Sequence, residues 1–224
     1  MIHGLTFGAA QAHSGVHGVN WSCSVSLSEY RKRRNFAKTP EPAGRLRARR
    51  RGRLFVVQKH CASRLHYDFR LEVGGVLASW AIPKGPSMNP RQKRLALRTE
   101  DHPLEYATFE GVIPEGEYGA GVVMVWDKGD YRPQHDKSIE VQLARGKIDL
   151  VLSGVKLRGG FTLIQIAVRS GRPNQGDAWL LIKQKDEFAA TSWNIEQAAP
   201  DRSVMTGRTL EEIAEGRSRR QRGL

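Results

Sequence analysis

Cysteine is scarce in this chain, and no long apolar run is present. Only two cysteines occur, Cys23 and Cys61, so neither a disulfide framework nor a cysteine-rich zinc module can be built. Such sparing use fits a reducing, cytoplasmic setting. No stretch is apolar and long enough to cross a membrane, and the first residues lack the basic and apolar regions of a secretory signal peptide. We therefore expect neither a membrane span nor export.

Acidic residues are in deficit: 23 Asp and Glu stand against 36 Lys and Arg, which gives a net charge of +13. This balance favours a polyanionic partner, and nucleic acid is the usual one. A membrane surface is the weaker alternative, because no amphipathic helix with large apolar residues accompanies the charge. The densest basic run, residues 45–53, is typical of a solvated segment and is also suited to contact phosphates through Arg49, Arg50 and Arg51.

The length of 224 residues allows one sizeable domain with extensions. Residues 1–26 are rich in Gly, Ala, Ser and His without periodicity, and we interpret them as a disordered extension. Residues 27–53 are predicted to form a short helix over 27–38 followed by the Arg-rich arm. Residues 54–200 are predicted to form the folded domain, and 201–224 a short helix and a basic tail.

Strand-like runs dominate the region from residue 54 onward. We predict eight of them: 54–60, 65–73, 76–82, 94–99, 121–126, 147–152, 160–168 and 178–184. Turn chemistry separates them, at Gly74-Gly75 as a two-residue hairpin, and at 127–129, 153–154 and 159–160. Helical periods are few, and we place short helices over 139–145 and 210–214. The pattern predicts a mainly-β domain, a closed or partly closed antiparallel β-barrel with short helical adjuncts.

The strand predicted over 65–73 alternates between two kinds of side chain, as expected of a half-buried strand. Apolar side chains occupy one face: Leu65, Tyr67, Phe69 and Leu71. Polar side chains occupy the other: His66, Asp68, Arg70 and Glu72. A solvated strand face without function is the plain alternative, and the polar residues before and after this strand favour a site.

His60 ends the preceding apolar run and could reach the same polar face. Two histidines and one aspartate form a plausible three-ligand metal site with open positions. Arg70, next in the row, is suited to hold an anion through two parallel hydrogen bonds. A metal beside an anion clamp suggests phosphate ester chemistry.

Further candidates follow downstream. Lys84 lies in a Pro/Gly loop after a strand and is either a phosphate contact or an ordinary exposed lysine. Arg94 shares an alternating face with Arg98 and could point into the same cavity. His102 and Tyr106 could donate hydrogen bonds to a phosphoryl oxygen, and a protonated His102 could act as general acid. A satisfied surface histidine is the alternative for His102.

The segment 110–121 is dense in glycine but lacks the Lys-Ser/Thr ending of a phosphate-binding P-loop. We interpret it as a tight structural loop that leads into the strand over 121–126.

Taken together, these motifs resemble the 3′-phosphoesterase domain of bacterial DNA ligase D. The resemblance covers about residues 28–215 and rests on several long motifs in the family's order: 58–60, 63–72, 80–86, 100–106 and 113–121, with 39–42 and 206–212. It implies a β-barrel enzyme that depends on manganese, or on another divalent transition metal, and acts on 3′ ends. Such enzymes remove a terminal ribonucleoside from a primer strand, and then hydrolyse the 3′-phosphate that remains to a 3′-hydroxyl.

The resemblance also assigns roles to residues. The metal ligands fall on His60, His66 and Asp68. The phosphate-binding and catalytic positions fall on Arg70, Lys84, Arg94, His102 and Tyr106. The N-terminal functional positions fall on Arg34, Asn35 and Glu41. Asn35 departs from the family's usual Asp, and an amide cannot supply the charge of that carboxylate.

The implied setting is bacterial DNA repair by non-homologous end joining, in the cytoplasm at the nucleoid. The implied partners are DNA or RNA-DNA primer-template 3′ ends, a ligase, a polymerase and the end-binding protein Ku. The chain is then either a stand-alone phosphoesterase or a piece of a larger ligase.

Two other functions compete with this one. The first is a DNA-end-binding module without turnover, supported only by Asn35. The second is a two-His-one-carboxylate iron oxygenase, whose ligands look similar but whose surroundings are not expected to be rich in Arg and Lys.

Overall fold

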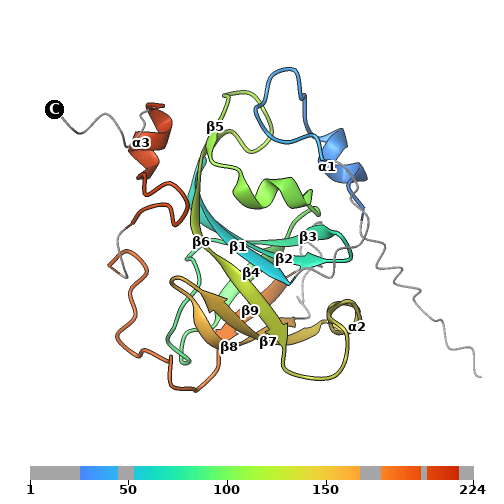
Figure 1. Ribbon diagram of the computed structural model, residues 1–224, viewed down its shortest axis with the longest axis vertical. Helices are drawn as coiled ribbons and strands as arrows, with labels where there is room; N and C mark the ends of the chain where they lie inside the picture. The colour runs from blue at the N-terminus through green and yellow to red at the C-terminus, as the bar shows by residue number, and fades with distance from the viewer. Residues whose placement is uncertain (1–25, 45–52, 167–177, 198–200, 217–224) are drawn as a thin grey trace, which may run out of the picture.

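Eight antiparallel strands close into a barrel in the computed structural model, which describes residues 26–44, 53–166, 178–197 and 201–216 (Figure 1). The strands are β1 (Leu54–Cys61), β2 (Leu65–Val73), β3 (Val76–Ile82), β4 (Arg94–Arg98), β5 (Gly111–Ile113), β6 (Gly121–Pro133), β7 (Lys147–Gly154), β8 (Arg158–Gln165) and β9 (Ala178–Lys183). The order around the barrel is β1-β2-β3-β4-β9-β8-β7-β6, and β6 pairs back with β1, while β5 extends the sheet beside β6. The mainly-β, closed-barrel prediction is confirmed.

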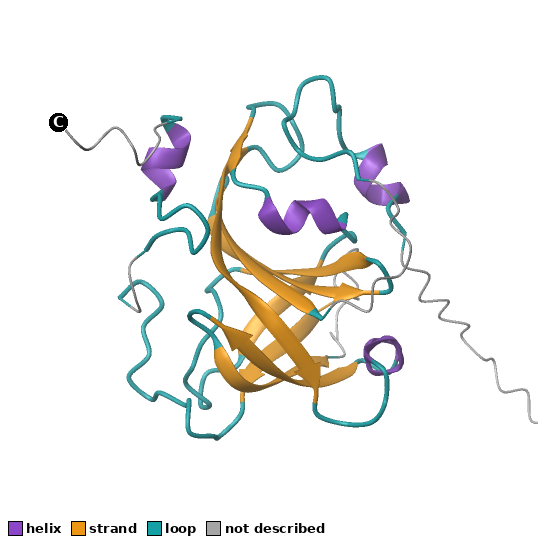
Figure 2. Cartoon of the chain, in the orientation of Figure 1, coloured by secondary structure: helices purple, strands orange, loops and turns teal. Residues whose placement is uncertain are grey.

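Four short helices lie outside the strands in the described ranges (Figure 2). They are α1 (Ser28–Lys32), the 3-10 helix η1 (Leu104–Thr108), α2 (Ile139–Ala144) and α3 (Leu210–Ala214). The helices expected over 139–145 and 210–214 are confirmed by α2 and α3, and α3 begins with a capping box formed by Thr209 and Glu212. None of the helices in the described ranges is long and apolar enough to span a membrane.

The barrel interior is apolar and closely packed. Side chains that alternate inward from the strands fill it, and the largest of them are at most 1% exposed: Phe55, Phe69, Trp80, Trp126 and Phe161. Phe69 packs against Trp80 with ring centroids 6.3 Å apart, and Trp80 packs edge-on against Trp179. This core stiffens the strands, because close-packed interiors resist displacement.

A second, smaller core lies on the outer face of β1, β3 and β6. There Val56, Leu77 and Val125 meet Tyr30 of α1 and Tyr106 of η1, and all five are at most 2% exposed. Figure 2 shows these two helices lying over the same end of the barrel. The outer face of β1, β3 and β6 is thus covered there, and Asp68 and Arg70 on the neighbouring face of β2 are at most 6% exposed.

The turn predicted over 127–129 is wrong, because these residues continue through β6. The Asp127 carboxylate is buried and accepts the backbone N–H groups of Val155, Lys156 and Leu157, in the turn between β7 and β8. Asp127 therefore stabilises the turn between β7 and β8 instead of a turn at its own position. The turns expected at 153–154 and 159–160 lie instead at the ends of β7 and β8, on either side of that turn.

Other predictions need smaller corrections. The helix expected over 27–38 is only Ser28–Lys32, and β5 and η1 were not predicted. The remaining strands differ from their predicted ranges mainly at the ends, with β6 extending furthest, to Pro133. The extension predicted to be disordered over 1–26 lies outside the described residues except for Ser26, and so do the arm residues Arg49, Arg50 and Arg51 and the tail after 216.

Candidate metal centre and phosphate pocket

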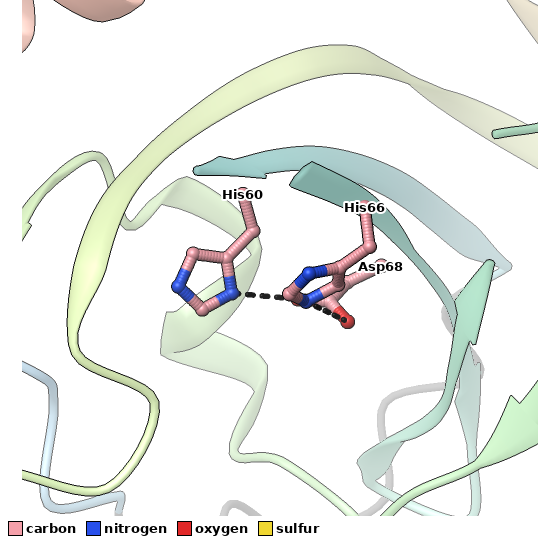
Figure 3. Close-up of side chains that lie close together, drawn as sticks. All are labelled: His60, His66 and Asp68. Atoms are coloured by element: carbon pink, nitrogen blue, oxygen red, sulfur yellow. Dashed lines mark ion pairs between the residues drawn. The ribbon is translucent and has the colours of Figure 1, made fainter. Parts of the chain in front are cut away.

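Three potential metal ligands converge on the outer face of the barrel (Figure 3). His60 of β1 and His66 of β2 are directly paired across the two strands, with ring centroids 4.7 Å apart. Asp68 follows His66 by two residues and so shares its face of β2. One atom from each of the three side chains can be chosen so that all lie within 4.8 Å of one another.

Backbone carbonyls fix which nitrogen of each imidazole is free. His60 Nε2 lies 2.9 Å from the Gly119 carbonyl oxygen, and His66 Nδ1 lies 2.9 Å from that of Arg64. A carbonyl only accepts, so these nitrogens carry the proton in the neutral rings. The free lone pairs are then on His60 Nδ1 and His66 Nε2, which lie 3.6 Å and 3.7 Å from the Asp68 carboxylate.

This arrangement fits a divalent transition metal. Two imidazole lone pairs and a carboxylate repel one another unless a cation lies between them, and the outer carbonyls orient the rings as metal-binding proteins commonly do. Two nitrogen ligands and one oxygen ligand suit several first-row metals and leave positions open.

Asp68 is held in its ionised form. Burial by itself would raise the pKa of this carboxyl, but the Arg70 guanidinium, His60 and His66 bring the pKa well below its usual range. The carboxylate therefore carries its negative charge at every pH near neutrality.

Arg70 is fixed by three hydrogen bonds beside the candidate ligands. Its guanidinium donates to Gln58 Oε1 (2.8 Å), Ser79 Oγ (2.8 Å) and Asp68 Oδ2 (3.1 Å), and it lies 4.9 Å from the centre of the Tyr106 ring. Gln58 in turn donates to the carbonyl oxygens of Tyr106 and Phe109. A buried cation is thus set rigidly next to the metal position.

His102 lies between two guanidinium groups. Its Nδ1 is 2.9 Å from Arg70 Nη1, and its Nε2 is 3.2 Å from Arg34 Nη2. An imidazolium would point its Nε2 proton at the Arg34 donor, while its Nδ1 proton would face the Arg70 donor as well as the Glu100 carbonyl oxygen, 2.9 Å away, which can accept it. Burial first, and then the charges of Arg70 and Arg34, hold the pKa of His102 well below its ordinary value. His102 is therefore neutral near pH 7 in the free protein, which argues against the protonated form considered from the sequence.

Glu41 joins the N-terminal segment to the pocket. Its carboxylate accepts from Arg34 Nε (2.8 Å), the Tyr106 hydroxyl (2.9 Å) and the Thr39 hydroxyl (2.8 Å). Arg34 also contacts Glu100, with Nη1 3.1 Å from Oε1. Burial raises the pKa of Tyr106 well above its usual value, and Glu41 adds to that effect, so the phenol keeps its proton.

A cavity of about 320 Å³ opens over these groups. Its lining includes seven of the residues singled out from the sequence: Arg34, His60, His66, Asp68, Arg70, His102 and Tyr106. The structure therefore brings the predicted metal ligands, the arginine predicted to hold an anion, and Arg34 of the N-terminal set into one pocket.

Four other candidates do not line the cavity, although one of them, Glu41, contacts two residues that do. Lys84 is exposed in the turn after β3, and Arg94 at the start of β4 donates to Gln92 Oε1 (2.7 Å). Asn35 is exposed, and its Oδ1 accepts the Ala37 N–H at 3.1 Å. Glu41 is buried behind Arg34. None of the four is among the residues that line the cavity within the described ranges.

Sequence reasoning missed two residues that hold Arg70, Gln58 and Ser79, and two that line the pocket, Glu100 and Tyr118. Gln58 and Ser79 are polar residues inside otherwise apolar strands, and their side chains lie on the same face of the sheet as Arg70. A lone polar residue at such a position could have indicated that it belongs to the site. Glu100 and Tyr118 carry no such signal, because both lie in loops whose path only the fold determines.

Fold and site together define a closed antiparallel barrel that carries, on its outer face, a candidate metal centre and a pocket lined by Arg34 and Arg70. Residues 58–165 match the family model described as the DNA ligase D 3′-phosphoesterase domain. The chain is 49% identical over 191 residues to the multifunctional non-homologous end joining protein LigD of Pseudomonas aeruginosa. The aligned region covers 84% of this chain and 22% of that protein.

Two further relatives agree. The LigD proteins of Mycobacterium tuberculosis (strain H37Rv) and Mycolicibacterium smegmatis are 42% and 41% identical over 177 and 166 residues, covering 78% and 72% of this chain. The chain spans about a fifth of the length of these curated relatives. It belongs to the DNA ligase D 3′-phosphoesterase domain family.

Proposed function

We propose that this protein is a metal-dependent 3′-phosphoesterase in DNA repair, which removes a 3′-terminal ribonucleoside and hydrolyses the resulting 3′-phosphate to a 3′-hydroxyl. The observation that carries this proposal is the convergence of two imidazole lone pairs and one carboxylate beside the buried Arg70. Membership of the family and the end-joining relatives support the choice of substrate.

His60, His66 and Asp68 would hold the metal, which we propose to be manganese. A bound divalent ion supplies Lewis-acid polarisation of a phosphoryl oxygen. Arg70 is placed next to Asp68 and would hold a second oxygen, neutralising charge that grows in the transition state. Because its other hydrogen bonds to Gln58 and Ser79 are already made, the guanidinium needs little reorganisation.

His102 and Tyr106 would serve as hydrogen-bonding groups at the back of the pocket. The phenol keeps its proton and can donate it in a hydrogen bond if it rotates from Glu41. The neutral His102 would orient a phosphoryl oxygen. For His102 to give a proton to the leaving alkoxide, the negative charge of the bound phosphate would first have to stabilise the protonated imidazolium.

The remaining candidates would contact substrate beyond the cavity. We propose that Lys84, Arg94 and the arm residues Arg49, Arg50 and Arg51 bind the nucleic-acid backbone, which would make affinity fall with salt. Arg34, Asn35 and Glu41 would act in the nucleoside-removing step, since Arg34 enters the pocket from the N-terminal segment.

The proposed setting is non-homologous end joining in the bacterial cytoplasm, at the nucleoid. The substrates would be 3′ ends of DNA or of RNA-DNA primer-templates, and a ligase, a polymerase and Ku would be the partners. The printed names of the relatives, each a non-homologous end joining LigD, support this setting.

A 5′-labelled primer-template that ends in one ribonucleotide tests the proposal, incubated with the protein and manganese and, as control, with a chelator. We expect metal-dependent conversion first to a 3′-phosphate strand and then to a 3′-hydroxyl strand. Processing of a supplied 3′-phosphate alone would restrict the proposal to the second step. Binding to the duplex without turnover of either end would refute it.

A further inference from the structure

An exposed aromatic side chain at the rim of the cavity has no role in the proposed chemistry. Tyr118 lies in the glycine-rich loop between β5 and β6, lines the cavity and is 45% exposed. The two other tyrosines of this region, Tyr30 and Tyr106, are at most 2% exposed. Tyr118 therefore offers aromatic surface to whatever enters the cavity, whereas the other two serve packing and hydrogen bonding.

The Tyr118 ring is held in place from the α1 side. Its hydroxyl accepts a hydrogen bond from Arg33 Nη1 at 2.7 Å. The guanidinium carbons of Arg33 and Arg34 lie 5.0 Å and 5.5 Å from the ring centroid. Guanidinium groups at this distance are attracted to an aromatic ring, so the side chain is ordered before any ligand arrives.

The loop that carries Tyr118 is also tied to the metal ligands. Gly119, the next residue, accepts the hydrogen bond from His60 Nε2 and has a φ of +77°, a conformation that glycine adopts without strain. The ring therefore lies at a fixed position relative to the metal centre. A group esterified to a phosphate at that centre must extend toward the rim.

We propose that Tyr118 stacks on the base of the 3′-terminal nucleoside and so acts as a specificity residue for its removal. The inference rests on the proposed function. A phosphodiester end carries a nucleoside that needs a binding surface at the rim, and a 3′-phosphate end carries none. Stacking on tyrosine accepts any base, because every base has a π-face, which suits an enzyme that meets ends of any sequence.

Three substrates separate stacking from other roles: a primer ending in a normal ribonucleotide, one ending in an abasic ribose, and one ending in a 3′-phosphate. We expect Tyr118→Ala to raise KM roughly tenfold on the first substrate. On the abasic and 3′-phosphate ends its KM should match that of the wild type. Tyr118→Phe should retain most of the stacking, and Phe188→Ala, which removes an aromatic ring that is 41% exposed outside the cavity lining, should change nothing.

An equal loss on all three substrates would overturn the proposal and show that Tyr118 only positions the loop and His60. An unchanged KM on the base-bearing end would overturn it as well. A separate readout does not depend on turnover: 2-aminopurine as the terminal base, bound without metal, should be quenched by the wild type and by Tyr118→Phe but not by Tyr118→Ala. Quenching without turnover would sustain the stacking while the proposed function failed, and absence of quenching in the wild type would refute the stacking itself.

Discussion

The two faces of β2 have opposite characters, although their residues alternate along one strand. The inward side chains Tyr67 and Phe69 are at most 2% exposed and pack among other rings of the barrel interior. The outward side chains Asp68 and Arg70 are also buried, but each is bound by charged or polar partners. Burial alone therefore does not distinguish the faces; the partners do.

In this fold, stability and chemistry depend on different faces of the same strand. Interior positions contribute to the free energy of folding by removing apolar surface from water. On the outer face, the charged side chains of Asp68 and Arg70 are held in fixed positions away from bulk water. Their desolvation costs free energy, and their hydrogen bonds offset that cost. Substitutions on the two faces should therefore have separable effects on stability and on activity.

The largest effect is expected inside the barrel. Phe69→Ala removes a fully buried ring and should lower the free energy of unfolding by about 3–5 kcal/mol, through lost burial and the cavity left behind. Urea unfolding followed by fluorescence measures this loss. The exposed Phe188→Ala is the matched control and should stay within about 0.5 kcal/mol of the wild type. A comparable loss in both variants would contradict the distinction between interior and surface.

The next effect is expected on the outer face. His66→Ala should reduce turnover of both the ribonucleoside and the 3′-phosphate ends by roughly 100-fold or more, because one of three ligands is lost. Its stability should change little, since the His66 side chain is 23% exposed. His135→Ala, with a side chain that is 61% exposed, provides the control and should retain activity. Retained turnover of His66→Ala with manganese would refute the ligand role.

The smallest effect is a dependence of stability on pH through His102. Burial, with Arg70 and Arg34 beside it, holds the pKa of His102 well below its ordinary value in the folded protein. An unfolded chain binds this proton below about pH 6.5, whereas the folded chain does not, so stability is fully present above that pH. It should be lost progressively on acidification, by at most about 1.4 kcal/mol per pH unit, until the folded pKa is reached.

The measurement is urea unfolding at pH 7.5 and pH 5.5, with a chelator present. The wild type should lose more stability between these two values than His102→Gln, whose amide does not titrate. The depressed pKa of Asp68 acts in the same direction but at lower pH, so it affects both proteins alike. Equal losses in the two proteins would show that the folded state accepts a proton on His102 as readily as the unfolded chain.

Much of the architecture was predictable because alternating apolar and polar residues indicate β-strands. The runs that became β1, β2 and β3 were placed nearly to the residue, and the hairpin at Gly74-Gly75 follows from its chemistry. The turn expected at 127–129 failed because a polar side chain can satisfy a distant backbone as well as its own, as the buried Asp127 does. Local propensity does not reveal whether a polar side chain will bind the backbone of its own segment or that of a distant one.

The candidate site was predictable where it follows one strand and obscure where it crosses several. His66, Asp68 and Arg70 share a face by parity, and the sequence alone places them together. Tyr118 and Glu100 reach the cavity from loops that lie 30 or more residues after Arg70 in the sequence. Lys84 and Arg94 do not line the cavity, although their positions in the sequence suggested that they would.

The amino-acid sequence by itself determined the strand periodicity, the basic character and the His-Asp-Arg row, because each depends only on residue type and short-range spacing. Everything else depends on the tertiary structure. Closure of β1 onto β6 brings the loop with Gly119 to His60, and Tyr106 of η1 covers the Arg70 end of the row. The neutrality of His102 follows from burial and from Arg70 and Arg34, which other segments contribute, whereas Asp68 is ionised in spite of its burial because Arg70, His60 and His66 lie beside it.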